Sequence, residues 1–422
     1  MMTGQNIVCF AKDWSEDPTS NNHVMRLLAE RNQVLWLNSI TTRTPTFTRG
    51  SDVRKIGRKL KAFMRGADEV SPGLSVFTPV VLPFPHSAWA SRLNQVILRA
   101  SVGVLRAQRR MSPFQLWSFL PSAVRYVGKF GEELLVYYVT DEFSQFKHLD
   151  GQKMAAMDRE MCERADLVFA TAHTLVERRK QFNPETHLAS HGVDHALFSS
   201  TLADSTSPAP EMAALPAGPV IGFVGLIESW IDLALIDAIA ERRPRWQVVL
   251  IGKSNVDLSS LKRHDNIHLL GRKPYAELPR YLKAFTVGVI PFVLNELTLN
   301  VNPIKLREYL SAGLPVVSSD IPEVRSYADD RDCFVAANHD QFLRALDQAV
   351  EGDTPEARHR RSQAMQRESW EYKVAEIGDH VMRVRIKKGL AFAARRTLNA
   401  KRPGADEVMS VGTCDPPQRR GA

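Results

Sequence analysis

Cysteine is scarce in this sequence of 422 residues, which contains only Cys9, Cys162, Cys333 and Cys414. No two of them are close in sequence, and neither a C-x-x-C motif nor a zinc-type spacing occurs. Those patterns mark metal sites and redox-active cysteines. The sequence therefore predicts neither kind of site, and a reducing cytosol is the simplest compartment for the chain.

Long apolar runs are also missing. No stretch of about 20 apolar residues, the length of a membrane-spanning helix, occurs in the chain. The N-terminal stretch MMTGQNIVCFAKDW has no basic segment followed by an apolar core. We therefore expect neither a spanning helix nor a signal peptide.

Basic residues outnumber acidic ones, with 55 Lys and Arg against 47 Asp and Glu, which gives a net charge of +8. This charge favours an anionic partner, such as a nucleotide, a phospholipid surface or a nucleic acid. No recognisable nucleic-acid-binding motif occurs, so we expect no nucleic acid among the partners. The apolar fraction of 44% is ordinary for a soluble globular protein.

Short apolar runs alternate with helical segments in both halves of the chain. Most runs are uninterrupted and rich in Val, Leu, Phe and Tyr, which is typical of strands buried on both faces of a parallel sheet. The pattern predicts two doubly wound, Rossmann-like α/β domains. The expected strands are 7–10, 34–37, 74–77, 116–119, 134–139 and 167–170, then 220–224, 248–251, 267–270, 287–290, 315–318 and 334–336. The clearest expected helices are 23–31, 153–164, 231–242, 275–284, 303–312 and 340–350.

The alternation is interrupted once, by the Ser-, Pro- and Ala-rich stretch SSTLADSTSPAPEMAALPAGP at 199–219. We interpret this stretch as a linker between an N-terminal domain at 1–198 and a C-terminal domain at 220–361. Helices at 362–390 are expected to cross back to the first domain, and the basic tail at 391–422 is expected to be disordered. Because ligands bind beyond the carboxyl ends of strands in open α/β sheets, the site is expected in a cleft between the domains.

The segment 302–313 predicts a helix with a special N-terminus. Asn302 suits the N-cap, Pro303 the first helical position and Gly313 the residue after the helix. The free N–H groups of the first turn, together with Lys305, suit a phosphate or diphosphate. Glu308 lies beside Lys305 on the same face, where its carboxylate can accept hydrogen bonds from a ribose diol. The alternative is an ordinary Lys–Glu pair on the surface, and spacing alone favours that alternative.

Several stretches resemble GT-B glycosyltransferases, in particular the family-4-like enzymes of bacterial polysaccharide synthesis. The resemblance rests on NPIKLREYLSAGLPVV, and in order and spacing on VIGFVGLIESWIDLALIDAIAERRPRWQVVLIG, IHLLGRKPYAELPRYLKAFTVGVIPF, ADLVFATAHTLVERR and HLASHGVDHALF. It covers roughly residues 5 to 385. It implies the two-domain GT-B fold, with a nucleotide-sugar donor on the C-terminal domain and an acceptor on the N-terminal one.

The resemblance also implies roles for individual residues. Glu308 would bind the donor ribose, Asn302 and Lys305 the diphosphate, and Gly225 and Leu226 would lie beside the donor. The turn with Gly271 and Arg272 would contact the nucleobase.

The sequence departs from the family at two places. Many relatives carry a second glutamate eight positions before Glu308, where this chain has Asn300; an amide can still bond sugar hydroxyls. The loop after the first C-terminal strand contains Glu228 and no basic residue, so Lys253 is expected to compensate.

The N-terminal domain has fewer candidates. In VYYVTDEFSQF, Asp141 follows a strand end and is a candidate base toward an acceptor hydroxyl; the alternative is a structural loop carboxylate. His23 and the Asp13–Trp14 pair lie in the segment that matches the acceptor loop. No D-x-D motif stands at a strand end, so we expect a mechanism without a metal or other cofactor.

Two basic amphipathic segments, 53–66 and 91–110, suggest a contact with an anionic membrane surface. The alternative for each is an ordinary solvated helix. With the net charge, they favour a cytoplasmic protein that is peripheral on the inner face of the membrane, which would suit a lipid-linked acceptor.

The sequence thus predicts a hexosyltransferase-type glycosyltransferase that moves a sugar from a nucleotide-diphosphate donor to a glycan or lipid-linked acceptor in cell-surface polysaccharide synthesis. Two alternatives stay open. One is a sugar-nucleotide epimerase of similar architecture. The other is a non-catalytic GT-B-like protein that binds a glycan or a protein partner, which Asn300 and the absent basic loop residues favour.

Overall fold

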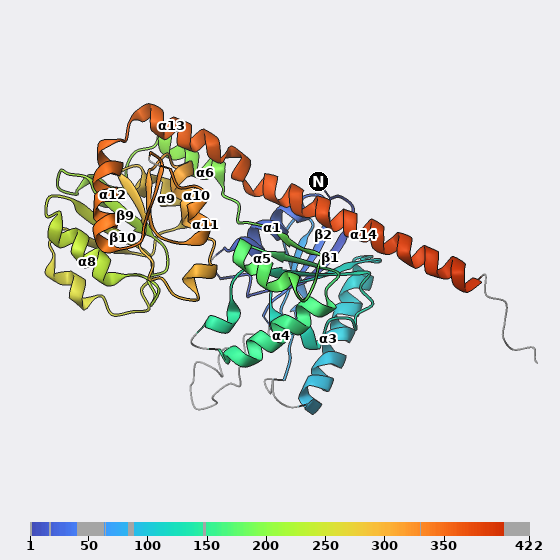
Figure 1. The fold of residues 1–422 in the computed structure, drawn as a ribbon. Coiled ribbons are helices and arrows are strands. Elements are labelled where there is room, and N and C mark those ends of the chain that lie inside the picture. Colours follow the sequence, from blue (N-terminus) through green and yellow to red (C-terminus); the bar gives the residue numbers. More distant parts are fainter. Residues whose placement is uncertain are drawn as a thin grey trace, which may run out of the picture. The chain divides into compact units, whose positions relative to one another are not determined.

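The computed structural model describes residues 2–16, 18–39, 63, 65–82, 88–146, 149–329 and 331–400. The chain divides into two units, Met1–Asp379 and His380–Ala422. Both β-sheets belong to the first unit, and Figure 1 shows each sheet with its helices.

The N-terminal sheet has eight strands in the order β3-β4-β2-β1-β5-β6-β7-β8. All neighbouring strands are parallel except β3, which pairs antiparallel with β4 at the edge. The strands are β1 (Asn6–Phe10), β2 (Gln33–Leu37), β3 (Ala67–Ser71), β4 (Leu74–Phe77), β5 (Gln115–Ser118), β6 (Leu134–Val139), β7 (Leu167–Ala170) and β8 (Thr186–Leu188).

The helices of this part of the chain include a long α3. The bounds are α1 (Ser20–Ala29), α3 (Ala88–Gln108), α4 (Gly151–Arg164), α5 (His173–Lys180) and α6 (His195–Ser199). Alternate strand residues face opposite sides of a sheet. Val8 and Phe10 of β1 therefore join one core cluster with Leu98 of α3, Met161 of α4 and Leu175 of α5.

The C-terminal sheet is parallel throughout, with the strand order β11-β10-β9-β12-β13-β14. Its strands are β9 (Val220–Val224), β10 (Gln247–Ile251), β11 (Ile267–Gly271), β12 (Val287–Ile290), β13 (Val316–Ser319) and β14 (Cys333–Ala336). The helices are α7 (Pro210–Ala213), α8 (Leu233–Arg242), α9 (Leu278–Leu282), α10 (Ile304–Ser311), α11 (Pro322–Arg325), α12 (His339–Glu351), α13 (Pro355–Ala364) and α14 (Trp370–Ala400).

Helices cover both faces of this second sheet. Val249 and Ile251 pack on the side of α9 and α10, whereas Val248 and Leu250 pack on the side of α8 and α12. A strand that is buried on both faces must be apolar at every position, which explains the uninterrupted apolar runs. The predicted fold class, two Rossmann-like parallel-sheet domains, is confirmed.

Two segments predicted to lack packed structure contain helices. The stretch 199–219 contains α7, and Ala209 and Met212 are buried in the core of the C-terminal domain, so much of the expected linker is packed structure. The tail expected to be disordered from 391 is helical to the end of α14, because 31 residues form one continuous helix. Residues 401–422 of that tail lie outside the described residues.

Cys9, Cys162 and Cys333 are unpaired and buried, and burial raises the pKa of the Cys333 thiol to about 12. In the part of the chain that the structure describes, no helix has the length and apolarity needed to cross a bilayer. In the same part, no cluster of His, Cys, Asp and Glu side chains could hold a metal ion.

Gly222 of β9 allows the ring of Phe285 to lie directly against the sheet. A Cβ at this position would lie 1.8 Å from Phe285 Cε2. We therefore predict that Gly222→Ala lowers the free energy of unfolding by about 1–3 kcal/mol, as overpacking in a filled core does. Urea denaturation measures the change.

Gly103 is the matched control for this substitution, because a Cβ there would contact nothing within 4 Å. Gly103→Ala in the interior of α3 should raise stability by up to about 1 kcal/mol through helix propensity. Equal effects of the two substitutions would contradict the packing argument.

Candidate functional site

The turns after three neighbouring strands of the C-terminal sheet are held together by backbone hydrogen bonds. Gly225 N–H donates to Ile251 O and Gly252 N–H to Gly271 O, each at 2.9 Å, and Ile227 N–H donates to Lys253 O at 2.9 Å. The predicted donor-binding positions 225, 253 and 271 therefore lie on one edge of the sheet. Gly225 follows β9, where the strand order reverses, which is where ligands bind in such sheets.

These turns approach one another so closely that glycine is required. A Cβ at Gly252, whose φ is +152°, would lie 1.7 Å from Gly225 O. The next residues are more open, since the Leu226, Lys253 and Arg272 side chains are exposed. The edge thus combines a tight glycine backbone with accessible side chains.

The helix predicted at 303–312 is α10, with Pro303 rather than Asn302 at the N-cap. The N-cap prediction for Asn302 was wrong, because tertiary contacts occupy its side chain. Its Nδ2 donates to Thr171 O at 2.7 Å, and its Oδ1 accepts a bond from Arg307 at 2.8 Å. The first turn of α10 therefore has no side-chain cap, so its N–H groups are not used by Asn302.

Lys305 and Glu308 form an ion pair with 2.6 Å between Nζ and Oε2. The Glu308 side chain is only 3% exposed and the Lys305 side chain 21%, so the alternative of an ordinary surface pair was wrong. A Cβ at Gly225 would lie 3.7 Å from Lys305 Cε, which places the lysine beside the turn after β9. The structure thus brings Gly225, Lys305 and Glu308 together.

Asn300 is also buried, two residues before the start of the Asn302–Pro303 turn. Its Nδ2 donates to Glu296 O at 2.6 Å, and its Oδ1 is buried without a hydrogen-bond partner among the described residues. An unpaired buried acceptor is costly, by about 1–3 kcal/mol. The hydrogen-bonding capacity of this oxygen is therefore unused among the described residues.

Sequence reasoning assigned no role to Tyr275, which connects the two candidate regions. Its ring centroid lies 6.2 Å from that of His23, and burial together with the negative charges of Glu308 and Asp194 raises the pKa of its hydroxyl. His23 also stacks on Trp370, with 5.0 Å between the ring centroids. Only the fold could identify these partners, because they come from three distant segments.

Arg307 is a second residue that sequence reasoning missed. Its buried guanidinium donates to Glu368 at 2.9 Å, to the Tyr327 hydroxyl at 2.9 Å and to Asn302 at 2.8 Å. These bonds tie the start of α10 to the segment before α14. Helix periodicity places Arg307 away from the face that carries Lys305 and Glu308, but it does not identify the distant partners of the guanidinium.

Asp141 follows β6 at the corresponding edge of the N-terminal sheet. Burial raises the pKa of its carboxyl group. The neighbouring Glu142 is bonded to Arg179 at 3.1 Å, and Arg179 also pairs with Asp158 at 3.0 Å. This buried ion-pair group holds the loop, and Asp141 is not part of it.

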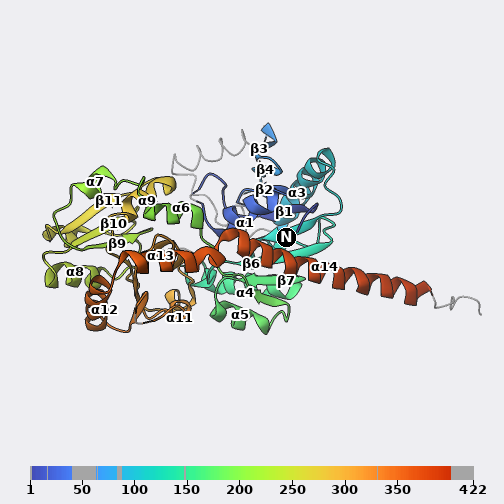
Figure 2. The ribbon, with the colours of Figure 1, turned by 90° about the horizontal axis from the view of Figure 1, so that it is seen from above.

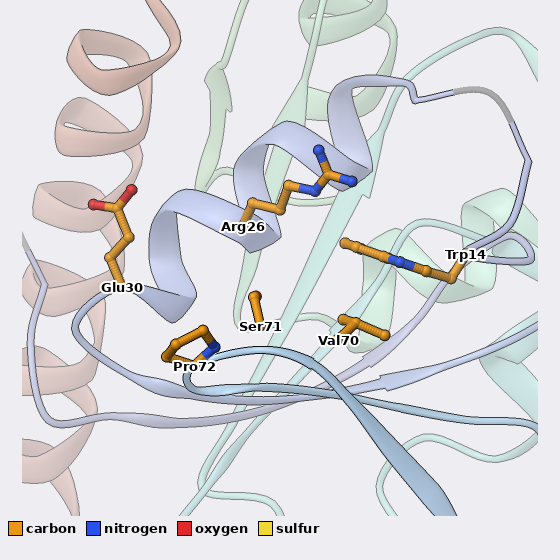
Figure 3. Close-up of a pocket in the computed structure, with 6 residues that line it drawn as sticks. All are labelled: Trp14, Arg26, Glu30, Val70, Ser71 and Pro72. Atoms are coloured by element: carbon orange, nitrogen blue, oxygen red, sulfur yellow. The ribbon is translucent and has the colours of Figure 1, made fainter.

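A pocket of about 530 Å³ lies between α1 and the β3–β4 hairpin. Figure 3 shows Arg26 on one side of the Trp14 ring, with Val70 on the other and Glu30 directed away. The Arg26 guanidinium lies 5.0 Å from the ring centroid, and Asp13 accepts bonds from Ser39. Of the predicted Asp13–Trp14 pair, Asp13 thus makes a contact within the loops, whereas Trp14 lines this pocket.

The comparison with protein families finds a match in the segment that forms the C-terminal sheet. Residues 218–351 match the family model described as glycosyl transferases group 1. This segment of the chain is therefore similar to the group 1 glycosyltransferases. The matched residues include β9 to β14 and α10, and so contain Gly225, Lys305 and Glu308.

A relative in Bacillus subtilis (strain 168) is named as a teichuronic acid biosynthesis glycosyltransferase, TuaH. It is 29% identical over 170 residues, which are 38% of this chain and 42% of the relative. The matching segment thus spans less than half the length of that protein.

Solved structures match nearly the whole chain. Sucrose-phosphate synthase from Thermosynechococcus elongatus has a TM-score of 0.65 at 14% identity, covering 90% of this chain and 99% of its own. Anabaena HepE in complex with UDP and glucose has a TM-score of 0.61 at 14% identity, covering 90% and 100%. At these identities the likeness establishes the GT-B fold.

His191 adds a pH-dependent contribution to stability. It is buried, with Nδ1 2.6 Å from Ser20 Oγ, and burial together with the positive charge of Arg307 lowers its pKa to about 3. The unfolded chain therefore takes up a proton near pH 6.5 that the folded chain does not. We predict that this residue makes the free energy of unfolding fall by up to about 1.4 kcal/mol per pH unit below that pH.

Urea denaturation of the wild type and His191→Asn between about pH 7 and pH 5 measures this contribution. The wild type should lose stability more steeply on acidification than the variant. The exposed His359→Asn is the control and should leave the slope unchanged. Parallel curves for the wild type and His191→Asn would contradict the assignment.

Proposed function

We propose that this protein transfers a sugar from a nucleoside-diphosphate donor to an acceptor hydroxyl. The observation that carries the proposal is the grouping of Gly225, Lys305 and Glu308 at the edge of a parallel sheet within a group 1 glycosyltransferase domain. A lysine beside free helix N–H groups suits a diphosphate, and a buried carboxylate suits a ribose diol.

The donor site of this proposal has two parts. Lys305, the first turn of α10 and Lys253 bind the diphosphate, and Glu308 binds the ribose. Donor binding draws Lys305 toward phosphate and exchanges part of the Lys305–Glu308 ion pair for donor contacts. Asn302 does not contact the donor through its side-chain amide, because Arg307 and Thr171 O already bind that amide; it positions the start of α10.

The remaining donor contacts follow the same edge of the sheet. Gly225 and Leu226 line the donor, Arg272 faces the nucleobase, and Asn300 Oδ1 accepts a bond from a sugar hydroxyl. The contact of Asn300 with a sugar hydroxyl is supported by the absence of any hydrogen-bond partner for this buried oxygen among the described residues.

The acceptor side of the proposal assigns the base to Asp141. Its raised pKa favours proton uptake from an attacking hydroxyl. His23, whose pKa burial lowers to about 4, is neutral at pH 7 and positions the acceptor or donor by hydrogen bonding. Departure of the diphosphate is assisted by Lys305 and the α10 N-terminus, with no metal ion in the scheme.

We place this reaction in cell-surface polysaccharide synthesis, with a glycan or lipid-linked acceptor at the cytoplasmic face of the membrane. The relative TuaH supports this context. The HepE complex with UDP and glucose supports UDP as the first diphosphate to test.

The donor site is tested by thermal shifts of the wild type, Glu308→Gln and Lys305→Met with UDP, GDP, ADP and CMP. At about 100 times its Kd, the matching nucleotide should stabilise the wild type by about 2.7 kcal/mol. Both variants should lose most of that shift. Glu351→Gln and Lys262→Met, which alter exposed residues of the same domain, are the controls and should keep it.

If the nucleotide still raises the melting temperature of both Glu308→Gln and Lys305→Met, the donor does not bind at α10. No shift with any nucleotide would favour the non-catalytic alternative. A nucleotide sugar that is converted to its epimer without transfer would favour the epimerase alternative.

The role of Asp141 is tested with Asp141→Asn. We expect kcat to fall about 10²–10⁴-fold, the usual value of a general base, while the UDP thermal shift stays unchanged. Release of nucleoside diphosphate from the matching nucleotide sugar measures turnover. Asp68→Asn, on the exposed strand β3, is the control. Unaltered kcat in Asp141→Asn would exclude it as the base.

A further inference from the structure

The helix α3 has apolar side chains on two opposite faces, one buried in the core and the other exposed in the part of the chain that the structure describes. At 100° per residue, positions 98, 102 and 105 share the inner face, where their side chains lie in the core of the N-terminal domain. Positions 89, 93, 96 and 104 share the outer face. Their exposed fractions are high for large apolar residues: Trp89 61%, Leu93 44%, Val96 64% and Val104 56%.

This outer stripe is long and continuous. It runs over about 22 Å of helix from position 89 to position 104, and the small residues Ala100 and Gly103 fill the gaps between the larger ones. Both views of the ribbon place α3 at the periphery of the N-terminal domain (Figures 1 and 2). Isolated exposed apolar residues are normal, but a row of them on one helix marks a surface that another body covers.

Positive charge borders the stripe on one side. Arg92 and Arg99 are exposed, seven residues apart, and so lie in one row along the helix. Lys129 adds a third charge next to this row, because its Nζ lies 3.2 Å from Gln95 Oε1. The helix contains no aspartate or glutamate. Arg106 continues the row in sequence, but its guanidinium is turned to Met111 O and Phe130 O.

We propose that the outer face of α3 docks on an anionic phospholipid surface. An apolar stripe bordered by positive charges matches the interface of an anionic bilayer. There the acyl chains contact the apolar side chains, and the anionic headgroups bind the arginines. Trp89 suits the boundary between the two layers. The inference rests on the proposed function in one respect: docking would bring the enzyme to a lipid-linked acceptor.

The structure also separates the two sequence segments that suggested a membrane contact. The segment 91–110 is mostly α3, and its exposed stripe carries the proposal. Of 53–66, only residues 63, 65 and 66 are described, and the proposal uses none of them.

Vesicle sedimentation tests the proposal, with no nucleotide or acceptor present. The full-length protein should bind vesicles of phosphatidylcholine with about 30 mol% phosphatidylglycerol and bind pure phosphatidylcholine at least about 10-fold more weakly. The triple variant L93S/V96S/V104S should lose at least about 10-fold of the binding to the anionic vesicles, and R92Q/R99Q should lose the salt dependence. The protein with L188S/Y372S, at exposed apolar residues outside α3, should bind as the wild type does.

Three results would overturn the proposal. The first is failure of the wild type to bind anionic vesicles, and the second is binding of the triple variant to them as tightly as the wild type binds. The third is self-association of the wild type in light scattering that the triple variant abolishes without any vesicle binding, which would assign the stripe to a second copy of the chain. The UDP thermal shift of the triple variant should be unchanged, so failure of membrane docking and failure of the donor site are distinguishable.

Discussion

Parallel strand pairing is the constraint on which the rest of the structure depends. It places the carboxyl ends of all strands of a sheet on one edge, so the turns after β9, β10 and β11 must be neighbours. The backbone bonds from Gly225 to Ile251 and from Gly252 to Gly271 then bring these turns into contact. Lys305 reaches this edge because α10 packs on the same sheet, with the Tyr309 hydroxyl accepting a bond from Val224 N–H at 2.8 Å.

Burial of charge gives the candidate donor site its chemical character. Glu308 is almost inaccessible, and a lone carboxylate in such a place is costly, so Lys305 is needed to compensate it. A pair of this kind is held in position before any ligand arrives. A diphosphate offers Lys305 an alternative partner, and a ribose offers Glu308 hydroxyl donors, so both charges remain compensated during exchange.

The residues of α10 serve two different purposes on two sides of one helix. Lys305 and Glu308 face the strand ends, while Arg307 binds Asn302, Tyr327 and Glu368. Arg307 thereby fixes the angle at which the chain enters the helix. Rigid support behind the groups that would contact a ligand is the usual requirement for a precise binding site.

The sequence by itself determined the two α/β domains, most of the strands and the helix that carries Lys305 and Glu308. These follow from uninterrupted apolar runs and from helix signals that act over a few residues. That Gly225 lies beside this helix was implied only by the resemblance to GT-B glycosyltransferases. The contacts of Asn302 with Thr171, of His23 with Trp370 and of Arg307 with Glu368 join segments that are 61 to 347 residues apart. Only the tertiary structure decided them, and likewise the exposure of the outer face of α3, because local patterns carry no information on which distant side chain fills the space beside a residue.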